Sequence, residues 1–437
     1  MVGTINAADL GANSDFMFGF GTSTAGLLGG NALWNSAGAL KTYDNGSPGP
    51  VIVNSISTST NYNIAVVLRS SGTYYFIKGG VFTNWTLLWQ GTTNNTATLY
   101  PSVIARTTSV FTADNIKIPT NLWLPTPLAY DTFGTPSSSS TQSSGPDGQT
   151  TPTVVWTGGT KAGGVMSVSP TDGGNLAVNG TFDADSDWTK GLGWVINSGT
   201  ASHTAQVSDS GMTNASGPAG VVGTWYSLSF DATMSAGTIT PYIAGTSFLG
   251  QSTSQVGVLN TGRGAGISKF NFYTNANVVA TIDNVSYKAL TLSSLFASVP
   301  VGTSNVVADV TIPAYTLGTQ AGLVIGLDSA GSPANFLIAY LKGNGQATVE
   351  QNLGGTYTTI VTAGTAAWNA SYVLRVIKDG TAVRLYYNNV LIGSGTCSAS
   401  ITGTRAGVFS TYASNTFDNF SVFARGTGNE FNALNNY

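Results

Sequence analysis

A six-residue phrase recurs three times in this chain, at spacings the size of a domain. In each copy an apolar or small residue precedes Asp-Asn, and alternating apolar and polar residues follow; the copies lie at residues 113–118, 282–287 and 417–422. Alternation with a period of two places one face of a β-strand in a core and the other in water. A phrase repeated at domain-sized spacing marks a repeated unit. We therefore predict a string of related β-sandwich modules, with the phrase on the closing strand of each.

The composition supports an all-β fold. Charged residues make up 8% of the 437 residues and glycine occurs 55 times, whereas the strong helix formers Glu, Lys and Arg are scarce. The hydrophobic fraction of 42% is enough to fill buried cores, so the abundance of Gly, Ser and Thr does not indicate disorder. We predict tandem β-sandwich or jelly-roll modules, and the length allows about two to four domains.

The charge and hydropathy patterns argue against two classes of partner. The net charge is −3 and Lys and Arg form no cluster, so we expect no nucleic-acid binding. No apolar run reaches the ~18–20 residues of a membrane span, and residues 1–16 lack the basic start and apolar core of a signal peptide. We expect neither membrane insertion nor export by a signal peptide. Cys397 stands alone, which excludes a disulfide within the chain and predicts a small buried apolar residue.

The first module is predicted over residues 1–125. Short apolar runs separated by Ser-Ser-Gly and Gly-Gly turns indicate a meander of antiparallel strands. The proline-rich stretch 119–127 then ends this pattern, because proline cannot donate a hydrogen bond to a strand ladder, and we expect it to connect two domains. The predicted strands are 62–69, 73–78, 85–90, 97–104 and 110–118.

The next segment contains two short runs, Tyr-Asp-Thr-Phe at 130–133 and Thr-Val-Val-Trp at 153–156. They resemble the opening of a concanavalin A-like (laminin-G-like) sandwich, which commonly begins with an Asp-x-Phe strand and a Trp-containing segment. Residues 134–151 between them are poor in apolar side chains. We favour a long surface loop within a domain for this stretch; a flexible linker is the alternative.

A further module starts abruptly at Asn175. It contains Asn-Leu-Ala-Val-Asn-Gly-Thr-Phe at 175–182, an apolar run around Trp194, and a closing run at 280–287. These runs resemble, in order, those of family 4/9-type carbohydrate-binding modules, which are β-jelly rolls. The resemblance covers residues 173–290 and implies the fold.

Residues 372–387 carry two apolar runs joined by Lys-Asp-Gly and resemble the core hairpins of a concanavalin A-like sandwich. The first strands of such a sandwich are missing just upstream, and residues 130–172 would supply them. We therefore expect a split sandwich of 130–172 plus 291–425, with the jelly roll 173–290 inserted and a tail at 426–437. Insertions are tolerated where the ends of a surface loop lie close together. Three modules strictly in series are the alternative.

The sequence contains few candidate catalytic residues. Glycoside cleavage needs an acid and a nucleophile or base a few ångströms apart. The chain has two glutamates, Glu350 and Glu430, in different regions, and we expect Glu350 to be a solvent-facing strand residue. His203 is the single histidine, and no serine lies in a recognisable nucleophile motif. We predict that the protein is not an enzyme.

The jelly-roll resemblance implies a structural calcium ion between the N-terminal loop and the last strand. The matching residues are Asp183, where the family commonly has Glu, and Asp283. The alternative, which we favour, is that Asp283 accepts backbone hydrogen bonds at the start of its strand, as Asp114 and Asp418 would.

Sugar binding would use aromatic rings, because a ring stacks against the apolar face of a pyranose, with polar side chains beside it. Trp194 lies within an apolar strand and is predicted to be core. The candidate carbohydrate-binding residues are Trp188, Trp225 and Tyr242 in the jelly roll and Tyr315, Tyr357 and Trp368 in the module that follows.

Runs in the first module at 62–69, 75–80 and 84–89 resemble a recurrent segment of bacteriophage virion proteins, in which such modules decorate a head or tail. The resemblance implies a non-enzymatic structural protein on the particle surface, as tail tip, fibre or capsid decoration, assembled in the host cytoplasm and released by lysis. Expected partners are other virion proteins, further copies of the chain in a homo-oligomer, and host cell-surface polysaccharide. Residues 1–125 would anchor and 130–425 would project. The alternatives are an exported polysaccharide-binding protein or glycan-active enzyme, and an extracellular filament subunit.

Overall fold

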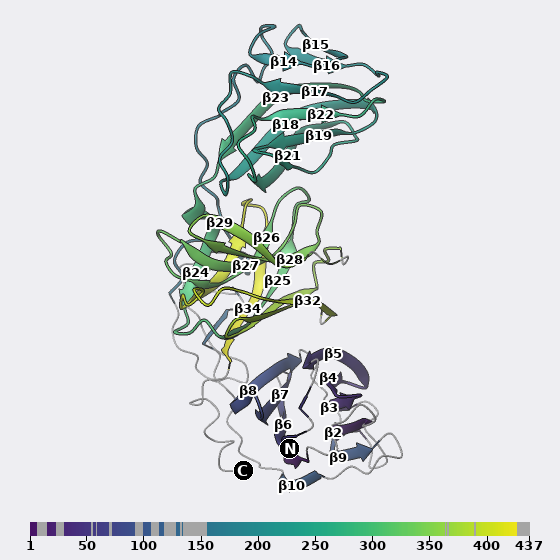
Figure 1. The fold of residues 1–437 in the computed structure, drawn as a ribbon, viewed down its shortest axis with the longest axis vertical. Coiled ribbons are helices and arrows are strands. Elements are labelled where there is room, and N and C mark those ends of the chain that lie inside the picture. The colour runs from purple at the N-terminus through teal and green to yellow at the C-terminus, as the bar shows by residue number, and fades with distance from the viewer. Residues whose placement is uncertain are drawn as a thin grey trace.

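The computed structural model describes most of the chain, and in that part the strands build three β-sandwiches stacked along the long axis (Figure 1). This confirms the predicted all-β fold. We name them the lower, middle and upper sandwich after their places in Figure 1. Among the described residues, no helix has the length and apolarity needed to cross a membrane. The described residues are 1–6, 15–22, 30–53, 56–57, 59–69, 72–91, 99–105, 113–117, 128–131, 133, 155–362, 364, 367–388 and 390–425.

The lower sandwich contains sheets with the strand orders β10-β1-β6-β7-β8 and β5-β4-β3-β2-β9. Apolar side chains from both sheets, such as Phe18, Leu33, Ile64 and Trp89, meet in one core. The alternation in the sequence predicted the position of a central strand correctly: β6 spans the predicted residues 62–69. The strands are β1 (Val2–Ile5), β2 (Asp15–Gly21), β3 (Asn31–Ser36), β4 (Ala39–Asp44), β5 (Ser47–Val53), β6 (Tyr62–Arg69), β7 (Gly72–Gly79), β8 (Phe82–Gly91), β9 (Tyr100–Ala105) and β10 (Ala113–Lys117).

Strands from two separate stretches of the chain build the middle sandwich. Its sheets have the orders β12-β13-β34-β25-β30-β31-β32 and β24-β33-β26-β27-β28-β29, and β11 pairs with β34. The first stretch supplies β11 (Ala129–Asp131), β12 (Thr160–Ala162) and β13 (Val165–Ser167). The second supplies β24 (Phe296–Pro300), β25 (Val306–Ala314), β26 (Ala321–Leu327), β27 (Asn335–Leu341), β28 (Ala347–Leu353), β29 (Thr356–Val361), β30 (Val373–Asp379), β31 (Ala382–Tyr387), β32 (Val390–Thr396), β33 (Arg405–Ser410) and β34 (Thr416–Ala424).

The residues behind the concanavalin-like resemblance meet inside the middle sandwich. Asp131 accepts hydrogen bonds from the Phe133 amide at 2.8 Å and from the Trp156 indole at 3.0 Å. The Trp156 ring lies 5.5 Å from Phe133 and 5.0 Å from Phe420 of β34, centroid to centroid. A carboxylate is acceptable in this buried place because it is hydrogen-bonded and pairs with the ammonium group of Lys161. The loop predicted at 134–151 and the connector at 119–127 lie outside the described residues.

The upper sandwich lies between β13 and β24 in the chain. Its sheets have the orders β14-β17-β22-β19-β20 and β15-β16-β23-β18-β21. Trp194 is 4% exposed in its core, as predicted, and His203 is 1% exposed beside it. The strands are β14 (Trp188–Lys190), β15 (Trp194–Asn197), β16 (Thr200–His203), β17 (Ser210–Asn214), β18 (Trp225–Ala236), β19 (Ile239–Ile243), β20 (Thr246–Ser247), β21 (Gln255–Arg263), β22 (Asn271–Thr274) and β23 (Val279–Ala289).

The chain enters and leaves the upper sandwich side by side. Asp172 and Leu290 form an antiparallel bridge, and the amide of Gly173 donates to the carbonyl of Ala289 at 2.8 Å. We call residues 171–173 and 289–291 the neck. A short 3₁₀ helix, η3 (Leu292–Leu295), follows the neck and leads into β24.

The recurrent Asp-Asn phrase forms a β-bulge on β10, β23 and β34. In each pairing, with β1, β18 and β25 respectively, the phrase strand advances three residues while its partner advances two. Asn284 and Asn419 both have a φ of 52°, and each amide donates to the preceding Asp at 2.7 Å. Asparagine tolerates this left-handed conformation better than most residues, and a bulge requires one irregular residue. The phrase is thus a signal for a bent strand.

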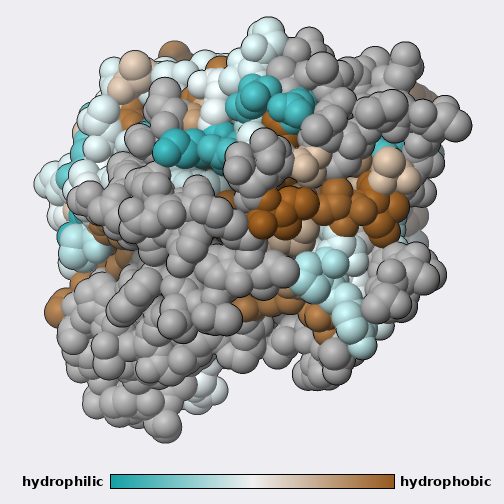
Figure 2. All heavy atoms as spheres, turned by 90° about the horizontal axis from the view of Figure 1, so that it is seen from below, coloured by the Kyte–Doolittle hydropathy of each residue, from teal (hydrophilic) through white to brown (hydrophobic). Residues whose placement is uncertain are grey.

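The lower and middle sandwiches touch through aromatic side chains. The ring of Trp89 lies 4.8 Å from that of Tyr386, and the guanidinium of Arg375 stacks on Trp89 at 3.6 Å. The Tyr386 hydroxyl also donates to the carbonyl of Val51 at 2.8 Å. Figure 2 views the molecule from the lower end, where described apolar residues form a brown band.

Candidate functional site

The outer face of one middle sheet is apolar, although outer faces of sandwiches are usually polar. Every residue of β26 is buried, because side chains such as Val324 point away from the core of the middle sandwich into a second apolar cluster. Ile338 of β27 and Phe409 of β33 belong to that cluster, and Trp225 of the upper sandwich covers them. The Trp225 ring lies 5.3 Å from Phe409 and its indole N–H donates to the Tyr357 hydroxyl at 3.0 Å. Burial of this apolar face stabilises the contact between the middle and upper sandwiches.

A buried hydrogen-bond network fixes the edge strand β21 against the middle sandwich. The Gln320 amide donates to the carbonyl of Thr261 at 2.8 Å, and its oxygen accepts from the Thr261 and Thr411 hydroxyls at 2.7 and 2.9 Å. The Thr261 amide also donates to the carbonyl of Gly318 at 2.7 Å. These buried polar groups form hydrogen bonds with one another, so a shift of β21 along the middle sandwich would break them. The network therefore fixes the position of β21 relative to the middle sandwich.

Two cavities open beside this contact, and Leu249 and Asn344 line both of them. Their volumes are about 520 and 920 Å³. We call the smaller one the charged cavity and the larger one the neutral cavity, and together they form the groove. Strand β21 contributes residues to the walls of both cavities.

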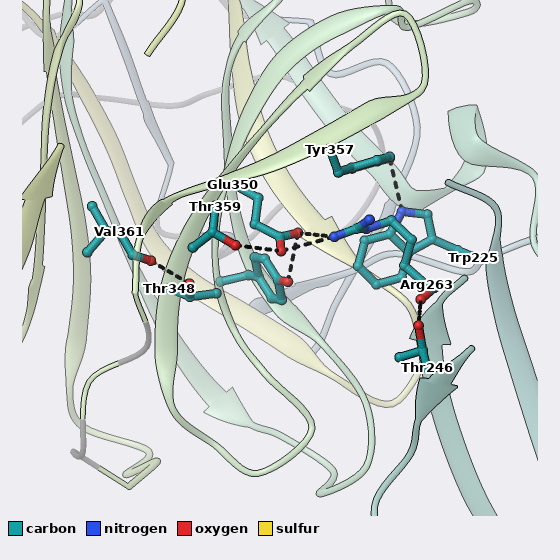
Figure 3. Close-up of polar contacts among 9 residues, drawn as sticks. Trp225, Thr246, Arg263, Thr348, Glu350, Tyr357, Thr359 and Val361 are labelled. Atoms are coloured by element: carbon teal, nitrogen blue, oxygen red, sulfur yellow. Dashed lines mark hydrogen bonds and ion pairs between the residues drawn. The ribbon is translucent and has the colours of Figure 1, made fainter. Parts of the chain in front are cut away.

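The charged cavity contains an ion pair that crosses the sandwich contact (Figure 3). The Nη2 atom of Arg263 lies 3.0 and 2.9 Å from the two carboxylate oxygens of Glu350, and the Tyr340 hydroxyl donates to Glu350 at 3.0 Å. The guanidinium also lies 4.1 Å from the centroid of the Tyr357 ring. Burial, together with the negative charge of Glu350, raises the pKa of Tyr340 well above its ordinary value, so this hydroxyl remains a donor.

The prediction that Glu350 faces solvent was wrong. Its residue exposure is 8%, because the upper sandwich covers the outer face of β28. The strand alternation placed its side chain on the outer face correctly, but nothing in the local sequence indicates that this face is covered.

The neutral cavity joins aromatic rings to uncharged polar groups. Trp368 is half-buried, its indole N–H donates to the Ile312 carbonyl at 3.0 Å, and its ring lies 5.9 Å from Tyr315. Tyr412 contributes a third ring. Among the described residues, those that line this cavity carry no charge; its polar side chains are Gln251, Ser252, Thr253, Gln255, Asn260, Thr316 and Asn344.

Asn260 lies in the wall of the neutral cavity and has a buried acceptor without a partner. The residue is 2% exposed, and its Oδ1 atom has no hydrogen-bond partner among the described residues. A buried carbonyl without a partner costs about 1–3 kcal/mol.

The six predicted aromatic residues fall into different environments. Tyr315 and Trp368 line the neutral cavity, and Trp225 lines the charged one, although Trp225 and Tyr315 are mostly buried. Tyr357 belongs to the sandwich contact. Tyr242 lies half-buried on the sheet that contains β19, with its ring 6.1 Å from Tyr273.

Trp188 belongs to the core of the upper sandwich and offers no ring face to a sugar. It is 6% exposed, its ring packs 5.2 Å from Phe182, and its indole N–H donates to the Asn179 carbonyl at 2.9 Å. The sequence around Trp188 is polar, and its ring is buried because an apolar sheet that includes Phe272 lies beneath it.

The residues proposed for calcium have local hydrogen-bond partners. Asp183 is exposed and accepts from the Thr181 hydroxyl at 2.7 Å, and Asp283 accepts from the amide of Asn284 at 2.7 Å. The described residues contain no group of three or more His, Cys, Asp or Glu side chains arranged to hold a metal ion. Calcium binding stays a prediction.

Neither His203 nor Cys397 lies in the groove. The Nδ1 atom of His203 is 2.8 Å from the Val278 carbonyl oxygen, and the ring packs on Trp194. Cys397 is 3% exposed in the core of the middle sandwich, as predicted, and burial raises the pKa of its thiol.

Comparison with known proteins finds similarity at the level of solved structures. No protein family and no curated protein matches the chain. The carbohydrate-binding module CBM66 from Bacillus subtilis is similar with a TM-score of 0.23 and 10% identity, over 55% of this chain and 96% of that one. Two structures of the GH43 protein BlXynB from Bacillus licheniformis have TM-scores of 0.22 and 0.21 at 11% identity, over 84% of this chain and 96% and 83% of theirs. At these TM-scores the similarity carries no argument about function.

Proposed function

We propose that the protein binds a glycan in the groove and performs no catalysis. The observation that carries this proposal is the neutral cavity, whose lining combines the rings of Trp368, Tyr315 and Tyr412 with amide and hydroxyl groups and no charge. A pyranose presents apolar faces and neutral hydroxyls, so rings and amides are the groups that suit it. The volume of about 920 Å³ lies within the range of small-ligand sites.

The carboxylates support a binding role over hydrolysis. Glu350 is the one carboxylate among the described residues that line the groove. It is engaged by Arg263 and Tyr340, whereas hydrolysis uses two carboxyl groups about 5–9.5 Å apart. Incubation with a broad polysaccharide panel should release no reducing ends, and turnover that Glu350→Gln abolishes would contradict this reading.

We further propose that the protein belongs to the surface of a phage particle, as tail tip, fibre or capsid decoration, with the lower sandwich as its anchor. The support is the resemblance of segments on β6, β7 and β8 to virion proteins. The lower and upper sandwiches lie at opposite ends of the long axis (Figure 1), so the upper sandwich can project from the particle while the lower one anchors the protein. Mass spectrometry of purified particles tests it, and a chain found only in the secreted fraction of bacterial cultures would contradict it.

Glycan binding is tested on the full chain with a polysaccharide array and two matched variants. Trp368→Ala removes a half-buried ring of the neutral cavity, whereas Tyr242→Ala removes a half-buried ring of the upper sandwich that lies outside the groove. We expect Trp368→Ala to weaken binding about tenfold, or ~1.4 kcal/mol, and Tyr242→Ala to leave it unchanged. The reverse pattern would move the site to the sheet that carries Tyr242.

A further inference from the structure

We propose that the charged cavity is an anion-binding subsite of the same groove, so that the glycan is acidic. The anionic group, a carboxylate or a phosphate, would belong to a sugar unit next to the one held at Trp368. This inference rests on the proposed glycan binding and narrows it to a ligand class.

The charges that line the charged cavity do not cancel. They belong to Arg263, Glu350 and Lys342. The Nη2 atom of Arg263 contacts both carboxylate oxygens of Glu350, so the two charges neutralise each other. Lys342 is exposed, and no carboxylate among the described residues lies within ion-pair distance of its ammonium group. The cavity therefore has an excess of one positive charge, in a chain whose net charge is −3.

Arg263 supplies a second donor that the protein leaves unused. Its Nη2 atom holds Glu350, but its Nε–H is buried and has no acceptor among the described residues. Leaving a charged donor unsatisfied is costly, and an anionic oxygen in the cavity would be a stronger partner than a neutral one. This N–H is covered by its neighbours, and the guanidinium is held by Glu350 and the Tyr357 ring, so an anion would reach the donor only if the guanidinium turned.

The two cavities are close enough to share one ligand. Leu249 and Asn344 line both, and β21 carries Asn260 of the neutral cavity and Arg263 of the charged one. Three residues along a strand span about 10 Å, so Asn260 and Arg263 lie about that far apart along β21. A glycan with a neutral ring at Trp368 and an acidic ring at the charged cavity would meet the excess positive charge there.

The test compares each acidic polysaccharide with a neutral form of the same backbone, so that only the charge changes. Uronic-acid polymers beside their carboxyl-reduced forms make one arm, and a polysaccharide with phosphomonoester side groups beside its phosphatase-treated product makes the other; the two arms distinguish carboxylate from phosphate. Affinities are measured on the full chain at low salt and in 0.5 M NaCl. Lys342→Gln removes the excess charge, and Lys190→Gln, from the exposed pair with Asp185, is the control.

We expect acidic forms to bind about three- to tenfold tighter than their neutral counterparts, an advantage that salt and Lys342→Gln both remove and Lys190→Gln retains. Equal affinity for charged and uncharged forms, or an unchanged preference in Lys342→Gln, would overturn the anion subsite. If neutral forms bind and Trp368→Ala weakens them, glycan binding would stand without it. Absence of binding to every polymer by the folded protein would overturn both proposals.

Discussion

At the residue scale, the Asp-Asn phrase shows that two residues can determine the local backbone conformation of a strand. Its Asp accepts the amide of the next residue, and its Asn adopts a φ of 52° at both positions where the angle is described. The phrase was predicted on the closing strand of each module, and it lies on β10, β23 and β34, the last described strands of the three sandwiches. The bulge itself could not be predicted from the alternation, because the alternation only defines which residues face the core.

The first prediction concerns this bulge. Asn419 is exposed, so its replacement changes backbone energetics with little effect on packing. Asn419→Val should reduce the free energy of unfolding by about 1–2 kcal/mol, because a β-branched residue is strained in the left-handed region. Asn419→Gly adopts that conformation freely and should stay close to the parent protein. Thermal denaturation of both variants measures the difference; a Gly variant as unstable as the Val variant would mean that the Asn side chain matters, not its backbone angle.

At the residue scale, sugar contact stays a prediction. Trp368 and Tyr315, two of the candidate residues, line the neutral cavity. Asn260 and Tyr412 were missed, since neither stands out in its own strand or loop. Their shared position arises from contacts between segments far apart in the chain, and one sequence gives no signal for that.

At the scale of elements, β26 and β27 show what the alternation of apolar and polar residues can and cannot predict about a strand. The sequence has apolar runs at 322–327 and 336–341, and the two strands agree with these runs to within one residue. Both runs are nearly continuous in apolar residues, a pattern typical of strands buried on both faces. The pattern can indicate that the outer face is covered, but it cannot identify the cover, which is Trp225 and its neighbours.

The second prediction concerns the ion pair between β21 and β28. Arg263→Met leaves the Glu350 carboxylate largely buried without its cation, and we expect a loss of up to about 3 kcal/mol in unfolding free energy. Adding Glu350→Gln should recover part of the loss, because a neutral amide is cheaper to bury. Urea denaturation of both single variants and the double variant gives the coupling energy.

An exposed ion pair provides the control for this cycle. Lys190 and Asp185 lie on the surface of the upper sandwich, and Lys190→Met should change stability by less than about 1 kcal/mol. Additive effects of Arg263→Met and Glu350→Gln would show that the pair does not hold the sandwiches together.

At the scale of the whole molecule, the sequence indicated where the chain interrupts one sandwich with another. The missing first strands of the concanavalin-like pattern led to that hypothesis, and in the structure β11 and β13 pair with β34. The groove could not be predicted in this way. It exists only where the upper sandwich docks on the middle one, and docking geometry depends on the shapes of two complete surfaces.

The third prediction is that the upper sandwich is an independent insertion. The neck holds Asp172 beside Leu290, so residues 175–288 can be deleted and the ends joined by a short linker without moving either stretch. The remainder should unfold cooperatively, as followed by Trp fluorescence. Deletion also uncovers Val324, Ile338 and Phe409, so the remainder should bind a hydrophobic dye and self-associate.

Replacing Ile338 with Asp in the deleted protein should restore a monomer, which light scattering can measure. An unfolded remainder, when residues 291–425 fold alone, would instead support modules in series.

The pairing of β34 with β11 and β13 means that the middle sandwich cannot be completed until late in translation. About 250 residues separate β13 from β34, so at the usual rate of a ribosome the early strands wait roughly 12–50 s for their partner. Trp156 and Met166 are apolar and would be uncovered in that interval. The upper sandwich is complete well before β34 emerges, and its neck brings Asp172 to Leu290. Once folded, it therefore shortens the loop that remains to be closed and lowers the entropic cost of the final step.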